Sequence, residues 1–116
     1  MAKITQRADF DAVMAAGISA STTHFALHIQ RPALRNRIGA VVPKRWAKNA
    51  VTRNAIKRQI YALAAQTQFK TEAADMVVRL RKTFQRKDFI SASSVALKQA
   101  VRTELWQLFD KAFRTP

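Results

Sequence analysis

Residues 44–61 read KRWAKNAVTRNAIKRQIY, and this stretch decides how the chain is expected to fold. It contains six basic residues and no acidic residue, and from Asn49, a favourable N-cap, it has the pattern of a helix. At about 100° per residue, Ile56, Ile60 and Leu63 fall on one side of that helix, while the cations spread over another side. The stretch therefore predicts a helix that packs on a core and presents positive charge to a polyanion.

The charge of the whole chain agrees with this interpretation. Its 116 residues include 21 Lys and Arg against seven Asp and Glu, which gives a formal net charge of +14. No acidic residue lies between Asp11 and Glu72, so the charge belongs to the middle of the domain and not to a tail. Such a surface attracts nucleic-acid phosphates through counterion release. We expect a nucleic-acid partner and no membrane partner.

Length and composition indicate one domain, residues 1–116, with a single hydrophobic core. The sequence has no run of about 20 apolar residues, and its first residues lack the apolar segment of a secretory signal. It has no cysteine, which excludes disulfides and thiolate chemistry. We expect a cytoplasmic protein.

Hydrophobic periodicity predicts the elements of the first half of the chain. A helix is expected over residues 6–16 with Gly17 as its stop, followed by a short extended piece at 18–20. Residues 24–30 alternate, which predicts a strand with Phe25 on its apolar face and His28 on the other face. Residues 37–42 read as the next strand and, across the turn at 31–36, are expected to pair with the first as a hairpin.

The second half begins with the central helix, which should run to residue 66 or 68. A third main strand is expected over residues 76–81 with its arginines on one face, followed by a loop at 82–90. A last helix begins at Ser91 or Ser93, and its apolar stripe comprises Leu97, Val101, Leu105, Leu108 and Ala112. This order of elements predicts an α+β sandwich with one sheet backed by helices.

No set of side chains has the spacing of a catalytic or metal-binding group. The acids are scattered, and Asp9 and Asp11 point to different sides of one helix. His24 and His28 share a strand face but lie about 13 Å apart along it, too far for one metal ion. We expect no catalytic residue and no intrinsic metal site.

The cations of the central helix carry the binding prediction. Arg53, Lys57 and Tyr61 follow one another at i, i+4 and i+8, with Asn54 and Arg58 beside them. Like charges at this spacing repel by a few tenths of a kcal/mol, a cost that changes sign when phosphates lie opposite. This pattern favours a nucleic-acid contact over a merely solvated face.

Trp46 lies in the basic loop that precedes the helix, between Arg45 and Lys48. An aromatic ring among cations can stack on a base or cover the end of the core. Both alternatives remain open from the residues.

The same residues resemble the signature of the protein subunit of bacterial ribonuclease P. Val42-Pro43-Lys44-Arg45 and then AVTRNAIKR at 50–58 are similar to that family's valine-rich strand, Lys-Arg pair and Arg-Asn-Arg helix. The likeness covers the whole chain, including Asp-Phe-x-x-Val at residues 9–13 and DMVVRLRK at 75–82. Ala55 and Tyr61 stand where the family has cations, Ala47 stands near its loop glycine, and Met14 and His28 replace common aromatics.

The resemblance implies a fold of the order α-β-β-β-α-β-α, with a mixed sheet backed by helices and a left-handed β-α-β crossover, as in the second domain of ribosomal protein S5. It also implies a non-catalytic protein subunit of an endoribonuclease. In that family the catalytic RNA, which binds Mg²⁺, removes the 5′ leader of precursor tRNA, and we expect one protein per RNA. The alternative is a structural RNA-binding protein of ribosomal type with no role in cleavage. An autonomous nuclease is the other rival.

Two groups of contact residues follow from the resemblance. The catalytic-RNA set comprises Lys44, Arg45, Lys48, Asn49, Arg53, Asn54, Lys57, Arg58 and Tyr61. The leader set, expected to line a cleft for the single-stranded 5′ leader, comprises Phe10, Met14, Phe25, His28, Arg81 and Lys82.

Overall fold

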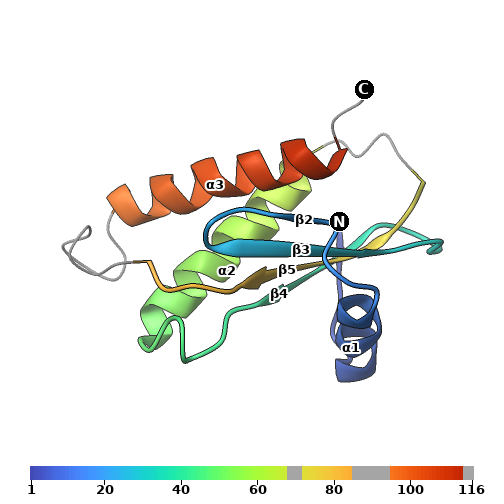
Figure 1. The fold of residues 1–116 in the computed structure, drawn as a ribbon, viewed down its shortest axis with the longest axis horizontal. Coiled ribbons are helices and arrows are strands. Elements are labelled where there is room, and N and C mark those ends of the chain that lie inside the picture. The colour runs from blue at the N-terminus through green and yellow to red at the C-terminus, as the bar shows by residue number, and fades with distance from the viewer. Residues whose placement is uncertain (68–71, 85–94, 114–116) are drawn as a thin grey trace.

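The computed structural model describes residues 1–67, 72–84 and 95–113. Along the chain these form β1 (Ala2–Lys3), α1 (Arg7–Ala15), β2 (Ala20–Ser21), β3 (Phe25–Gln30), β4 (Arg37–Val41), α2 (Ala50–Gln66), β5 (Asp75–Leu80) and α3 (Val95–Phe113). The strands make one mixed sheet in the order β1-β4-β5-β3-β2. Helices α2 and α3 cover one face of it, and α1 lies on the other (Figure 1). The predicted α+β fold with a mixed sheet backed by helices is confirmed.

Helix α2 begins where the sequence predicts. The side chain of Asn49 accepts a hydrogen bond of 2.8 Å from the backbone N–H of Val51, which satisfies one free donor of the first turn. The helix ends at Gln66, and the Thr67 hydroxyl donates to the carbonyl of Leu63 at 2.7 Å. Polar side chains therefore close both ends of the helix that carries most of the catalytic-RNA set.

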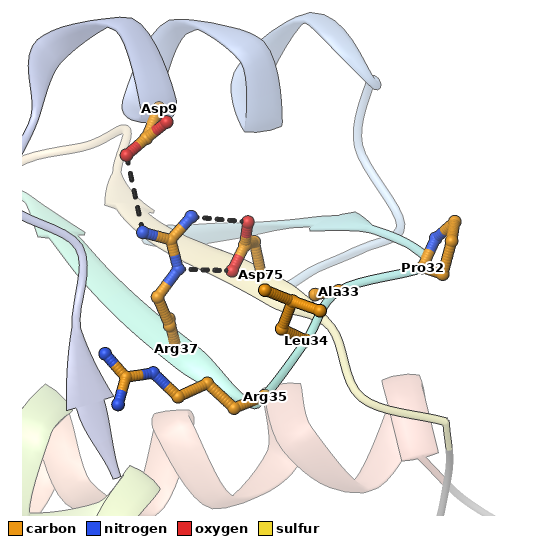
Figure 2. Close-up of a pocket in the computed structure, with 7 residues that line it drawn as sticks. All are labelled: Asp9, Pro32, Ala33, Leu34, Arg35, Arg37 and Asp75. Atoms are coloured by element: carbon orange, nitrogen blue, oxygen red, sulfur yellow. Dashed lines mark hydrogen bonds and ion pairs between the residues drawn. The ribbon is translucent and has the colours of Figure 1, made fainter.

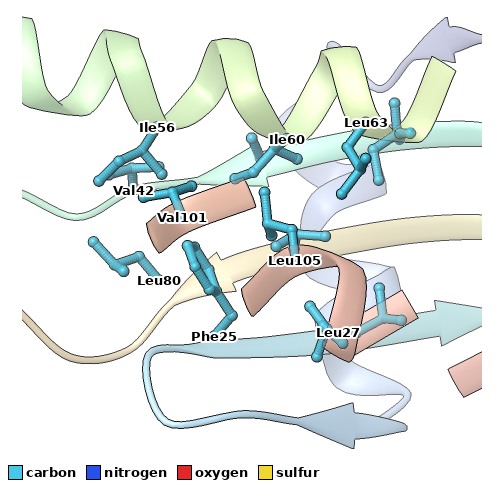
Figure 3. Packing of buried hydrophobic residues seen from close by; sticks show 14 of the residues in the cluster. Phe25, Leu27, Val42, Ile56, Ile60, Leu63, Leu80, Val101 and Leu105 are labelled. Atoms are coloured by element: carbon cyan, nitrogen blue, oxygen red, sulfur yellow. The ribbon is translucent and has the colours of Figure 1, made fainter. Parts of the chain in front are cut away.

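The main core lies between the sheet and the pair α2 and α3. Ile56, Ile60 and Leu63 point from α2 toward Phe25 and Leu27 of β3 (Figure 3). The stripe on α3 is confirmed, because its first four members are buried in this core and its last packs against it; these are Leu97, Val101, Leu105, Leu108 and Ala112. This core fixes α2 with its cationic side outward.

A smaller core joins α1 to the opposite face of the sheet. Val13 packs with Ile4 and Val77, and the half-buried Phe10 and Met14 lie against them. The ring of Phe10 lies directly on Gly39 of β4, where a Cβ would overlap the ring. Gly17, with φ +92°, follows α1 in the left-handed conformation that glycine adopts readily.

The predicted hairpin between β3 and β4 is wrong. Strand β5 lies between them, antiparallel to β3 and parallel to β4. The turn at residues 31–36 reverses the chain without selecting a neighbour, and β5 is largely buried on both faces, which favours a central position. The two-residue strand β1, which pairs with β4, was not predicted because it is too short for a periodic signal.

Other boundaries differ from the predictions by one or two residues. The first helix spans 7–15, the short extended piece pairs at 20–21, and β5 occupies 75–80. Most of the loop at 82–90 and the start of the last helix at Ser91 or Ser93 lie outside the described residues. In the described part of the chain, no helix has the length and apolar character needed to cross a membrane.

Candidate nucleic-acid interface

The catalytic-RNA set occupies the loop at residues 44–48 and the outer side of α2. Lys44, Arg45, Lys48, Asn54 and Arg58 are exposed. Arg53 and Lys57, the other two cations of the set, are half-buried, and the 17 residues of α2 include no acid. The local field is therefore positive along the whole outer side of the helix.

Arg53 has a structural contact within this surface. Its Nη1 donates to the carbonyl oxygens of Ala47 at 3.0 Å and Lys48 at 2.8 Å. The guanidinium thus holds the basic loop against the first turns of α2. Arg53 can position the loop cations as well as contribute charge of its own.

Two other members of the catalytic-RNA set also have structural partners. Asn49 uses its side-chain oxygen as the N-cap of α2. Tyr61 packs against the main core, and the ammonium of Lys3 lies 4.3 Å from its ring centroid. Both residues help to shape the surface, and their direct contact with RNA stays a prediction.

The alternatives for Trp46 are decided by its packing. Its ring packs against the main core, with its Nε1 buried, and the Arg45 guanidinium lies 5.4 Å from the ring centroid. It therefore covers the end of the core and is not free to stack on a base. Ala55, where the family has a cation, is also buried in the core, so a small apolar residue suits that position.

The leader set is not gathered on one face, because Phe25 points away from Phe10, Met14 and His28. Phe25 has no exposed surface and lies in the main core under α2 and α3. Phe10 and Met14 lie on the α1 side of the sheet. Successive strand residues alternate between faces, so Phe25 and His28, three apart, cannot share one. The prediction that Phe25 lines the leader cleft is corrected accordingly.

His28 is on the α1 side, but it is only 4% exposed. Its Nδ1 lies 2.8 Å from the Gly17 carbonyl, which can only accept, so Nδ1 carries the proton and donates. Its Nε2 accepts from Nε of Arg79 at 3.3 Å. Burial, with a smaller contribution from the charge of Arg79, lowers the pKa of His28 and favours the neutral ring. The His28 ring, although a member of the leader set, is therefore too buried to stack on a base.

The two remaining members of the leader set lie just beyond β5. Arg81 donates from Nε at 3.2 Å and from Nη2 at 2.6 Å to the Thr22 carbonyl. Lys82 is exposed. Arg79 was not in the predicted set, although it lies half-buried beside His28 on the α1 side. The alternation of residues 75–81, which places Arg79 and Arg81 on one face, was the signal for it.

A hollow opens beside the first turn of α1 (Figure 2). The guanidinium of Arg37 points into it and contacts Asp75 through two hydrogen bonds of 2.7 Å and Asp9 at 3.3 Å. The hydrogen bonds that Arg37 donates to the Asp75 carboxylate raise the pKa of Arg37. Asp9 and Asp75, with Arg37 and the residues of the 32–35 loop, line the hollow, and no member of the leader set does. Within the described ranges no three His, Asp or Glu side chains are placed to hold a metal ion.

Comparison with known proteins agrees with this architecture. The family model described as ribonuclease P matches residues 1–112. A ribonuclease P protein component from Ralstonia pickettii is 37% identical over 117 residues, covering 97% of this chain and 80% of the relative. One from Paraburkholderia xenovorans is 34% identical over 98 residues, covering 80% of this chain and 67% of the relative.

Solved structures give the same fold. The ribonuclease P protein of Staphylococcus aureus superposes with a TM-score of 0.73 at 22% identity, covering 98% of this chain and 99% of that one. The protein of Thermotoga maritima superposes with a TM-score of 0.70 at 22% identity, covering 93% and 94%.

Proposed function

The chain belongs to the ribonuclease P protein family, and we propose that it is the RNA-binding, non-catalytic protein subunit of this tRNA-processing endoribonuclease. One chain associates with one catalytic RNA in the cytoplasm. The RNA holds Mg²⁺ and removes the 5′ leader of precursor tRNA. The protein raises the affinity for the precursor and supports Mg²⁺ binding by screening phosphate repulsion.

The single observation that carries this proposal is the division of α2 into two sides. Ile56 and Ile60 are buried in the main core, whereas Asn54 and Arg58 are exposed on a helix without acids. A folded surface that concentrates cations without compensating carboxylates is favoured when phosphates neutralise it. We therefore assign the contact with the catalytic RNA to the basic loop and the outer side of α2.

The α1 side of the sheet is the proposed place for the leader. Phe10 and Met14 are half-buried there, so each offers part of an apolar surface to an unpaired base. Arg79, half-buried on the same side, and the exposed Lys82 beyond β5 supply positive charge for phosphates. Contacts of this kind are mostly to the backbone and to ring faces, so the sequence preference is weak.

The α2 assignment is tested by equilibrium binding to a bacterial ribonuclease P RNA over a range of salt concentrations. Replacing Lys57 or Arg58 by Ala should each lower the slope of log K against log salt by about one. Arg7→Ala, which removes an exposed cation on α1, is the matched control and should leave the slope unchanged. Unchanged slopes for both α2 variants would show that the RNA does not bind at this helix.

A further inference from the structure

Helix α3 presents a surface that the proposed function does not use. Lys98, Arg102 and Trp106 follow one another at i, i+4 and i+8, and we call them the α3 stripe. The side chain of Trp106 is 51% exposed, unlike the buried leucines on the opposite side of the same helix. Single exposed apolar side chains are common on protein surfaces, so exposure alone does not mark a site. What distinguishes Trp106 is that two cations precede it in line on the same side of the helix.

The α3 stripe lies on the flank of α3 that borders α2. Nη2 of Arg102 donates to the side-chain oxygen of Gln66, the last residue of α2, at 2.8 Å. The other flank of α3 borders β2, because Lys111 donates to the Ser21 carbonyl at 3.1 Å. Since α2 and α3 form one layer on the same face of the sheet (Figure 1), an RNA bound along α2 can reach the α3 stripe without crossing the sheet.

The chemistry of the stripe selects the kind of partner. A second copy of this chain would bring together two molecules of net charge +14 at a face that is itself cationic. A nucleic acid offers the opposite charge, and an aromatic ring in line with cations is the composition of sites that stack unpaired bases and hold the phosphates beside them. Both cations lie on the N-terminal side of Trp106, and the exposed Asp110 follows one turn later, so the phosphates are expected on the N-terminal side of the ring.

We propose that the α3 stripe binds an unpaired segment of the catalytic RNA. Trp106 stacks on one base, and Lys98 and Arg102 contact the neighbouring phosphates. This inference rests on the proposed function, because it assumes that the catalytic RNA is the partner of α2. It gives the protein a second surface for the same RNA. The Gln66–Arg102 hydrogen bond lies where this surface meets the end of α2.

The test is equilibrium binding of the full chain to a complete ribonuclease P RNA. Trp106→Ala should weaken binding about tenfold, the effect of losing one stacked base, while Trp106→Phe retains most of the affinity. Gln107→Ala, a change at the neighbouring exposed position, is the matched control and should bind as the parent does. Lys98→Ala should lower the salt slope by about one without touching the ring. If Trp106→Ala lowers the melting temperature, its weaker binding could reflect unfolding, and the salt slope of Lys98→Ala then tests the proposal. A slope lowered by about one supports the contact, and an unchanged slope contradicts it.

The outcomes separate the two proposals. If Trp106→Ala and Lys98→Ala bind as the parent does while Arg58→Ala binds more weakly, the α3 contact is wrong and the α2 assignment stands. If the parent chain does not bind the RNA at all, the proposed function fails as well. If sedimentation shows a dimer that Trp106→Ala makes monomeric, the stripe is a contact between copies and the inference is overturned.

Discussion

Arg37 and Asp75 lie opposite each other on the parallel strands β4 and β5, and their side chains make two hydrogen bonds of 2.7 Å each. The same guanidinium reaches Asp9 of α1 at 3.3 Å. One cation therefore joins two central strands to the first turn of the helix beside the proposed leader surface. Together with the packing of Val13 against Ile4 and Val77, this contact holds α1, and Phe10 on it, against the sheet.

Asp75→Asn should lower the free energy of unfolding by about 1–2 kcal/mol, because a half-buried guanidinium loses its charged two-point partner. Urea unfolding measures this. The matched control is Asp11→Asn, whose partner Arg7 lies 4.0 Å away with both side chains largely exposed (94% and 71%). That change should stay within about 0.5 kcal/mol. Equal losses of stability for Asp75→Asn and Asp11→Asn would show that the Arg37–Asp75 contact stabilises the fold no more than an exposed ion pair does.

Gly39→Ala should displace the ring of Phe10, because a Cβ at residue 39 would occupy the space of that ring. We expect a loss of about 1–2 kcal/mol of stability and weaker binding of leader-containing precursor tRNA. In a Phe10→Ala background the same substitution should cost much less, since the two residues contact each other. Additive effects on unfolding would contradict the packing of Phe10 on Gly39.

The pH dependence of stability should contain a contribution from His28. Its pKa in the folded chain is lowered by burial, below the ordinary value of 6.5 that it regains on unfolding. The unfolded chain therefore binds a proton more readily, and the stability present above pH 6.5 is lost as the pH falls toward the folded pKa. The slope from one group is at most about 1.4 kcal/mol per pH unit. His28→Gln should make the free energy of unfolding, measured with urea, depend less on pH between pH 5 and 7.5. An unchanged pH dependence would contradict a lowered pKa for His28.

The packing of the helices was predictable because it follows from local periodicity. The spacing of Ile56, Ile60 and Leu63 on α2, and the apolar spacing on α3 from Leu97 to Leu108, identify the core sides correctly. The sheet order was not predictable in the same way. Residues 31–36 show that the chain turns, but the partner of β4 depends on β5, which comes more than 30 residues later.

The candidate contact residues likewise fall into those that local periodicity predicts and those that it does not. Exposed cations such as Arg58 follow from the helix pattern alone. Phe25 was assigned to the leader through family likeness, although strand alternation already placed it opposite His28. Local periodicity thus predicts which side of an element is buried, while the partners of Arg53 and His28 depend on how separate elements meet.

Arg53→Ala should affect both folding and RNA binding, because its Nη1 holds the carbonyls of Ala47 and Lys48. We expect a loss of about 1 kcal/mol of stability, together with a loss of RNA affinity that exceeds one phosphate contact. Lys57→Ala should reduce affinity alone. Thermal unfolding and RNA titration of both variants distinguish these roles. Identical behaviour of the two variants would mean that the loop does not depend on Arg53.

The proposed function is tested most directly by cleavage of a labelled precursor tRNA at low Mg²⁺. A bacterial ribonuclease P RNA is assayed with and without this chain, and the chain is also assayed alone. We predict that the chain alone is inert and that it restores correct 5′ cleavage to the RNA. Binding without any gain in cleavage would favour a structural RNA-binding protein, and cleavage by the chain alone would contradict the account.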